Sequence, residues 1–265
     1  MSDNTAASGM VDRLDSQGSG PTEEAITFVR AYLAPGPMDP TLLARVGDPD
    51  VIATHEAASK ALRERDWPNL SQYRDANAAL SGGHLKAIFI GDSITEAWVA
   101  GDPELFTGGV IGRGIGGQTS PQILLRFMAD VVRLKPVVVH LLAGVNDIAG
   151  NTGPTTLADY QNNMTAMIAL AHAHGLRVIL GSLLPAGSFM WRPSVDPRPR
   201  IAEINDWLMA LATERGLIFA DYHSTLATPD GSMLAEFTRD GVHPTAAGYA
   251  AMRPIALAAL TSAMG

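Results

Sequence analysis

The sequence has 265 residues, of which 46% are hydrophobic and 17% are charged, a balance typical of a folded protein with a substantial core. Its net charge of −8 argues against nucleic acid or an anionic membrane as a partner, and the lack of cysteine excludes disulfides, zinc–thiolate sites and a cysteine nucleophile. The N-terminal segment lacks the apolar core of a signal peptide, and no run of about 18 apolar residues suggests a membrane span. We therefore expect a cytoplasmic protein.

Three regions of different composition follow one another along the chain. Residues 1–21 are rich in Gly, Ser, Asp and Asn, and we expect a disordered tail there. Residues 22–83 read as several short helices, the last of them over residues 69–80, with an interruption by Pro-Gly-Pro at 35–37, and predict a helical N-terminal extension. From residue 84 to residue 265, apolar runs alternate with amphipathic stretches, which indicates the main domain of the protein.

The apolar runs of the main domain have the length and composition of buried β-strands, and amphipathic stretches at helical spacing separate them. Strands that alternate with helices predict a parallel sheet covered on both faces, in the α/β class. The predicted strands are residues 85–91, 109–114, 137–144, 177–184 and 217–223.

Polar and glycine-rich segments follow several of these strands. In a parallel sheet covered by helices, ligands bind beyond the carboxyl ends of the strands, so we expect these segments to converge there. They are Gly91-Asp92-Ser93, residues 112–120, residues 144–147 and, from a loop near the C-terminus, residues 240–243.

Ser93 lies between a strand and a helix, and two roles are possible for it. A serine in this position is commonly just an N-cap, and the G-x-S-x-G elbow is only half matched. A nucleophilic serine instead needs a base and a third group that orients the base. Asp240 and His243 are spaced so that one turn presents a carboxylate and an imidazole together, although the pair could also simply cap the helix after Pro244.

The glycines of residues 112–117 match the spacing of a dinucleotide fingerprint, but they follow the second strand, and no acidic residue ends the next one. We therefore expect no nucleotide cofactor, and we expect the glycines to let a backbone N–H approach a substrate. Asn146 either makes a turn or donates its amide to an oxyanion. No metal site is expected, because His172 and His174 are two residues apart on a helix and face different ways.

Taken together, GDSITEAW, GRGIGGQTS, AGVNDIAGN and DGVHPTAAGY resemble the four sequence blocks of the SGNH, or GDSL-type, hydrolase family. The resemblance covers about residues 84–263, in the order typical of the family. It implies a flavodoxin-like three-layer α/β/α sandwich with about five parallel strands. It also implies a catalytic domain over residues 84–265 that hydrolyses esters with serine and without a metal or another cofactor.

The motifs also imply roles for individual residues. Ser93 resembles the nucleophile, His243 the general base and acid, and Asp240 the residue that orients His243. Gly117 and Asn146 resemble the oxyanion donors that act beside the Ser93 N–H.

The substrate is expected to be a small-molecule ester with a short acyl group, from acetyl to butyryl. The loops are too short to build a long sealed tunnel, and each further buried CH₂ adds at most about 0.8 kcal/mol. Trp191 and Phe189, in the loop 185–200, are candidates for lining the substrate pocket, unless this loop is only a packed crossover. The same motifs also fit an acyltransferase or a thioesterase, and a non-catalytic binding module is a further alternative. The sequence predicts no oligomeric state.

Overall fold

The computed structural model describes residues 23–45, 48–80 and 84–265. The predicted disordered tail, residues 1–21, lies outside the described residues. Helices and strands alternate from residue 87 to residue 264 and build a three-layer α/β/α sandwich, as the sequence predicted.

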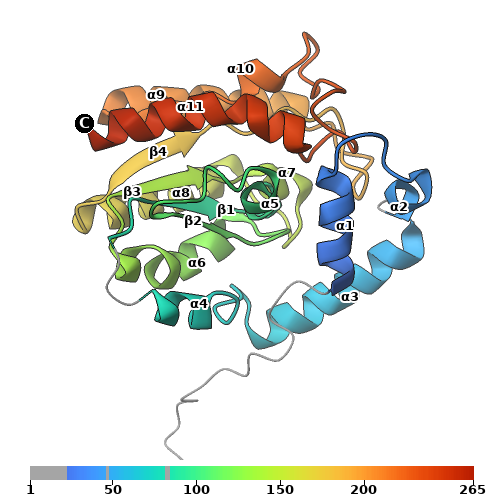
Figure 1. Ribbon diagram of the computed structural model, residues 1–265, viewed down its shortest axis with the longest axis horizontal. Helices are drawn as coiled ribbons and strands as arrows, with labels where there is room; N and C mark the ends of the chain where they lie inside the picture. The colour runs from blue at the N-terminus through green and yellow to red at the C-terminus, as the bar shows by residue number, and fades with distance from the viewer. Residues whose placement is uncertain (1–22, 46–47, 81–83) are drawn as a thin grey trace, which may run out of the picture.

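A parallel sheet forms the middle layer (Figure 1). Its strands lie in the order β2-β1-β3-β4-β5, which is the flavodoxin-like order. Gly91 at the end of β1 is in register with Gly114 of β2 and with Leu142 of β3, so these three strands end at one level. The bounds are β1 Ala87–Gly91, β2 Val110–Gly114, β3 Val138–Leu142, β4 Arg177–Gly181 and β5 Ile218–Ala220.

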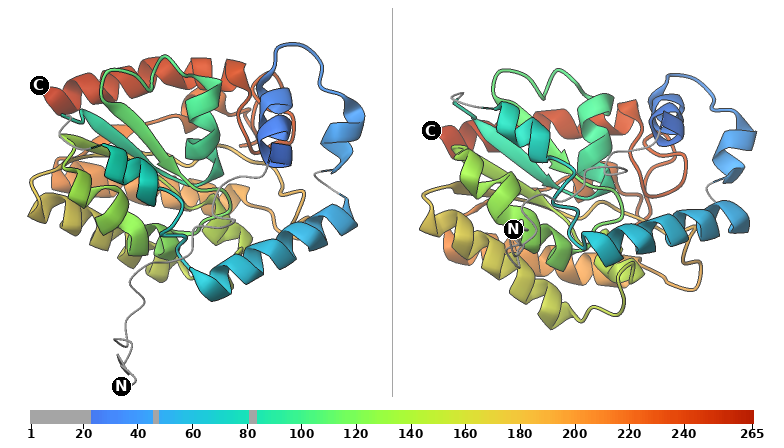
Figure 2. Two further views of the ribbon diagram at one scale, coloured as in Figure 1. Left: turned by 60° about the horizontal axis from the view of Figure 1, so that its bottom comes forward. Right: turned by 90° about the horizontal axis from the view of Figure 1, so that it is seen from below.

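Helices cover both faces of this sheet (Figures 1 and 2). Helices α5 and α11 pack on one face, and α6, α8 and α9 lie on the other. This double cover buries β1 and β3 at every position, which explains their uninterrupted apolar sequences. The bounds are α5 Ser93–Gly101, α6 Ser120–Asp130, the 3₁₀ turn η2 Val132–Leu134, α7 Val145–Ala149, α8 Leu157–Ala173, α9 Arg198–Arg215, α10 His223–Leu226 and α11 Ala246–Met264.

The segment before the sheet is helical, as expected, but its last helix is shorter than the predicted one over residues 69–80. Asn69 has a positive φ of 53°, and the Asp66 carboxylate accepts the N–H groups of Leu70 and Ser71 at 2.8 and 2.9 Å. These local bonds favour turns over a helix at this point. The bounds are α1 Glu23–Leu33, α2 Pro40–Ala44, α3 Pro49–Arg65 and α4 Arg74–Ala79.

The helical extension contacts the main domain at both of its ends. Helix α1 lies beside α5 and the loop that precedes α11, whereas the segment around α4 lies along α6 (Figures 1 and 2). Gln118 and Gln122 donate their side-chain amides to the carbonyls of Pro68 and Trp67 at 2.8 and 2.7 Å. Helix α3 spans the distance between these two ends. None of its residues is buried. The boundary between extension and main domain at residues 83 and 84 stays a prediction.

Candidate active site

Ser93 is the first residue of α5, directly beyond the carboxyl end of β1. The N-cap of this helix is Asp92, whose Oδ1 accepts the N–H of Ile94 at 3.0 Å. Gly91 allows the backbone to lie close to its neighbours at this point, because a Cβ on this residue would lie 2.2 Å from the carbonyl oxygen of Leu142 and 2.3 Å from Thr95 Oγ1. The reading of Ser93 as only an N-cap is therefore wrong, and its hydroxyl is available for another partner.

Asp240 and His243 lie in one tight turn ahead of α11. Gly241 has a φ of 82°, a left-handed conformation that favours glycine. Asp240 Oδ1 accepts the backbone N–H groups of Val242 and His243 at 2.9 and 2.8 Å, which fixes the carboxylate relative to the imidazole. Asp240 Oδ2 lies 2.7 Å from His243 Nδ1.

The other ring nitrogen of the imidazole reaches the serine. His243 Nε2 lies 3.0 Å from Ser93 Oγ, so Ser93, His243 and Asp240 form one hydrogen-bonded row from segments 150 residues apart in sequence. The Asp240 side chain is 5% exposed, whereas that of His243 is 29% exposed. The row thus runs from a buried carboxylate to a partly exposed serine, which is the arrangement that serine hydrolysis requires.

The charges of the pair reinforce this arrangement. Burial lowers the pKa of His243, but the negative charge of Asp240 and its hydrogen bond outweigh burial and raise this pKa above its ordinary value. Burial of Asp240 is likewise outweighed by the charge of His243 and by hydrogen bonds, so the pKa of Asp240 lies far below its usual range. An ionised Asp240 holds the proton on His243 Nδ1 and leaves Nε2 to accept a proton from Ser93.

The glycine loop after β2 lies against the serine. A Cβ added to Gly116 would be 3.8 Å from Ser93 Cβ. The Gly116 N–H donates to Glu96 Oε2 at 2.9 Å, so it is not free for a substrate. Gly117 has a φ of 74°, and its N–H has no hydrogen-bond acceptor within the described part of the chain. These contacts favour Gly117 over Gly116 as the donor to an oxyanion.

Asn146 follows Gly144 at the carboxyl end of β3 and lies in α7. Its Nδ2 donates to the carbonyl of Gln118 at 3.0 Å, and its Oδ1 accepts from Asn151 Nδ2 at 2.8 Å. These two bonds fix the orientation of the amide, and its second N–H has no acceptor among the described residues.

Buried polar side chains hold the strand ends together. The Arg126 guanidinium is fully buried and donates to the carbonyls of Gly91 and Arg113, both at 2.8 Å, and to Gln118 Oε1 at 2.6 Å. Asp147 accepts the backbone N–H and the hydroxyl of Ser120, at 2.9 and 2.6 Å, and thereby ties α7 to α6. The loops that carry the candidate oxyanion donors are therefore braced before any substrate binds.

Trp191 and Phe189 occupy different positions relative to the site. Trp191 is partly exposed, its ring centroid is 6.3 Å from that of His243, and its Nε1 donates to Asn151 Oδ1 at 3.1 Å. Phe189 is fully buried and stacks on Trp191 with a centroid distance of 5.1 Å. Trp191 is thus placed to line the site. Phe189 packs against the Trp191 ring on its buried side and presents no surface to a substrate.

Sequence reasoning missed several residues of this site. Glu96 is three residues after Ser93 on the same helix and therefore lies on the same helix face. An acidic residue at this spacing could have indicated a contact near Ser93. Asn151 belongs to the AGVNDIAGN block, but only the fold reveals its contacts with Asn146 and Trp191. Tyr32 of α1 contacts Asp240, and nothing in the sequence pattern indicates that contact.

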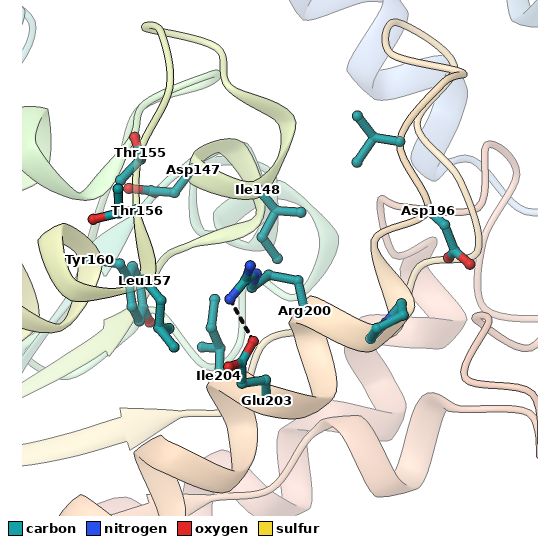
Figure 3. Close-up of a pocket in the computed structure, with 12 residues that line it drawn as sticks. Asp147, Ile148, Thr155, Thr156, Leu157, Tyr160, Asp196, Arg200, Glu203 and Ile204 are labelled. Atoms are coloured by element: carbon teal, nitrogen blue, oxygen red, sulfur yellow. Dashed lines mark hydrogen bonds and ion pairs between the residues drawn. The ribbon is translucent and has the colours of Figure 1, made fainter.

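A separate cavity of about 400 Å³ lies between α7, α8 and α9 (Figure 3). Arg200 and Glu203 of α9 form an ion pair at its wall, with a separation of 2.5 Å. None of the three residues of the hydrogen-bonded row lines it. In the described ranges no group of three or more His, Cys, Asp or Glu side chains is arranged to hold a metal ion.

A flavodoxin-like sheet that carries a serine, a histidine and an aspartate in hydrogen-bonded order at its carboxyl edge is the architecture of a serine hydrolase. Residues 89–251 match the family of GDSL-like lipases and acylhydrolases. The chain belongs to this family, and it is a carboxylic ester hydrolase.

Solved structures of similar proteins agree with this assignment. A predicted acylhydrolase from Bacteroides fragilis is 40% identical, with a TM-score of 0.73 over 76% of this chain and 99% of its own. A GDSL-like lipase from Bacteroides thetaiotaomicron is 38% identical, with a TM-score of 0.72 over 75% of this chain and all of its own.

The uncharacterized lipoprotein YqeF of Bacillus subtilis is a more limited match. It is 33% identical over 79 residues, which make up 29% of this chain and 32% of that protein. The matched part therefore spans about a third of the length of this relative. Among the helices that the structure describes, none has the length and apolar character needed to cross a membrane.

Proposed function

We propose that this protein is a serine esterase that cleaves short-chain carboxylic esters through an acyl-enzyme on Ser93. The observation that carries the proposal is the hydrogen-bonded row of Ser93, His243 and Asp240, with separations of 3.0 and 2.7 Å. A hydroxyl, a base and an orienting carboxylate in this order are what a nucleophilic serine needs.

Acylation begins when Ser93 Oγ attacks the ester carbonyl carbon and its proton passes to His243 Nε2. The carbonyl π electrons move to the oxygen, which becomes an oxyanion. The N–H groups of Ser93 and Gly117 and the Asn146 amide stabilise this charge, and donors that are already held in place need little reorganisation as the charge develops. Collapse of the intermediate breaks the ester C–O bond, and the alcohol leaves with the proton from His243.

Deacylation repeats the same steps with water in place of serine. His243 takes a proton from water, and the resulting hydroxide attacks the acyl carbon while the same donors hold the oxyanion. The bond to Ser93 Oγ then breaks, Oγ regains its proton from His243, and the carboxylic acid leaves. Asp240 remains ionised throughout and stabilises the transient imidazolium.

The contacts of Trp191 support the preference for short acyl groups. Its indole lies beside His243 and is held by Asn151, which in turn is bound to Asn146. Because these hydrogen bonds fix Trp191 in place, the indole cannot easily move aside to make space for a longer acyl chain beside Ser93. Each further CH₂ would gain at most about 0.8 kcal/mol, and only where the site can bury it.

A panel of p-nitrophenyl esters from acetyl to palmitoyl tests this proposal. We expect kcat/KM to peak at or below about four acyl carbons and to fall beyond about eight, because longer chains find no further apolar surface to bury. Trp191→Ala should shift the optimum to longer chains, and Met209→Ala, at an exposed position on α9, is the matched control. A wild-type preference for palmitoyl over acetyl esters would contradict the proposed substrate class.

Acyl transfer and thioester cleavage are the other reactions open to the same site. A competing alcohol or a thioester substrate in this assay measures them directly, because they differ only in the acceptor or the leaving group. The cytoplasmic location expected from the sequence stays a prediction.

A further inference from the structure

Helix α1 of the N-terminal extension reaches the turn that carries Asp240 and His243. Tyr32, near the end of this helix, is only 5% exposed, and α1 lies beside the α/β sandwich (Figure 1). Its hydroxyl lies 2.7 Å from the backbone carbonyl oxygen of His243 and 3.1 Å from Asp240 Oδ1. It also accepts the N–H of Arg239 at 3.0 Å. One phenol thus contacts Asp240, His243 and the residue before Asp240, Arg239.

A second set of contacts holds the same helix in place. The Arg239 guanidinium donates to the carbonyl of Tyr32 at 2.8 Å and to those of Ala34 and Gly36 at 2.8 and 2.7 Å. The Tyr32 carbonyl lies in the last turn of α1, where a helix lacks its own donors, and the other two carbonyls follow directly after the helix. Tyr32 therefore binds the turn, and the turn binds the end of the helix, in a reciprocal arrangement.

The rings are also in contact. The Tyr32 ring lies edge-on to the His243 imidazole with a centroid distance of 6.5 Å. Burial and the negative charge of Asp240 raise the pKa of Tyr32. The hydroxyl therefore keeps its proton across the pH range of the assays and remains a donor to Asp240 or to the His243 carbonyl.

We infer that Tyr32 is a positioning residue of the active site, which holds the Asp240–His243 turn so that His243 Nε2 meets Ser93 Oγ. It acts through His243 and Asp240 and does not touch the reacting atoms. Helix α1 of the N-terminal extension accordingly completes the environment that positions the base. This inference rests on the proposed function, because it assumes that His243 is the base.

The test is Tyr32→Phe, which keeps the ring and its packing and removes only the hydroxyl. We expect kcat for p-nitrophenyl acetate to fall by about tenfold with KM changed by less than about twofold, since loss of a hydrogen bond to a charged group is worth about this factor. Tyr222→Phe is the matched control: the Tyr222 hydroxyl is also buried and bonded, to His140 Nε2 at 2.9 Å, but it does not contact the turn. Both variants should lower Tm similarly, and only Tyr32→Phe should lower kcat.

A second measurement separates positioning from general loss of stability. In a His243→Ala background, Tyr32→Phe should leave the residual rate of single-turnover acylation unchanged, because Tyr32 acts only through His243. The inference is overturned if Tyr32→Phe has the kcat of the wild type, or if it lowers the rate by the same factor with and without His243.

Failure of the proposed function has a different signature. If the wild type hydrolyses no ester of the panel, or if Ser93→Ala retains the activity, the proposed function fails. If the wild type is active, Ser93→Ala is inactive and Tyr32→Phe equals the wild type, only the inference about Tyr32 fails.

Discussion

Replacing Glu96 by Gln should stabilise the protein at alkaline pH. Glu96 holds the Gly116 N–H beside Ser93, and burial raises its pKa from 4.5 to about 7, although the bond from Gly116 and the charge of Arg126 act in the opposite direction. A carboxyl whose pKa is raised on folding destabilises the folded state once it ionises. The penalty is small below the unfolded value of 4.5, grows as pH rises, and is complete above about 7. At about 1.4 kcal/mol per unit of pKa shift, this penalty reaches at most about 3.5 kcal/mol.

Urea unfolding at pH 5 and pH 8, with linear extrapolation to water, measures this effect. Glu96→Gln should exceed the wild type by under about 1 kcal/mol at pH 5 and by about 2–3 kcal/mol at pH 8. Glu214→Gln, at an exposed position on α9, controls for the loss of one negative charge. If Glu96→Gln is no more stable than the wild type at pH 8, or if its advantage is the same at both pH values, the reasoning about this partly buried carboxylate is refuted.

Further predictions concern the catalytic steps. Asn146→Ala should lower kcat by about 10²–10³ with a smaller effect on KM, since its N–H acts on the oxyanion; a variant impaired mainly in KM would instead make Asn146 a substrate-binding residue. The rate should rise with pH and level off, with a midpoint above 6.5, because neutral His243 is the base and Asp240 raises its pKa; a rate that falls over this range would exclude His243 as base. EDTA should leave the rate unchanged, and loss of activity restored by a divalent ion would contradict a mechanism that needs no metal ion.

The sheet and the convergence of the motifs could be predicted because they depend on local patterns. The apolar runs at β1 and β3 are buried along their whole length, and a parallel sheet brings its strand ends to one edge. Ser93 and the 240–243 turn therefore meet although 150 residues separate Ser93 from His243. The turn itself could be read from the spacing of Asp240 and His243.

The contacts that the sequence could not predict are those between segments without a repeating pattern. Tyr32 is 208 residues before Asp240, and an aromatic residue near the end of a short helix is as easily a core residue as a partner of the base. Loop 185–200 has no periodicity, so the difference between the buried Phe189 and the partly exposed Trp191 follows only from packing. The helix predicted over 69–80 begins only at Arg74, because Asn69 has a positive φ of 53° and the Asp66 carboxylate holds the residues after it in turns.

The central claim is that Ser93 is the nucleophile, and labelling by a fluorophosphonate followed by peptide mass spectrometry tests it most directly. We predict one covalent adduct on Ser93 in the wild type, with loss of ester hydrolysis in proportion to labelling. Ser93→Ala should show no adduct and a kcat lower by several orders of magnitude, with an unchanged circular dichroism spectrum. An adduct on another residue, or a Ser93→Ala variant that keeps more than about a tenth of the wild-type activity, would contradict the account.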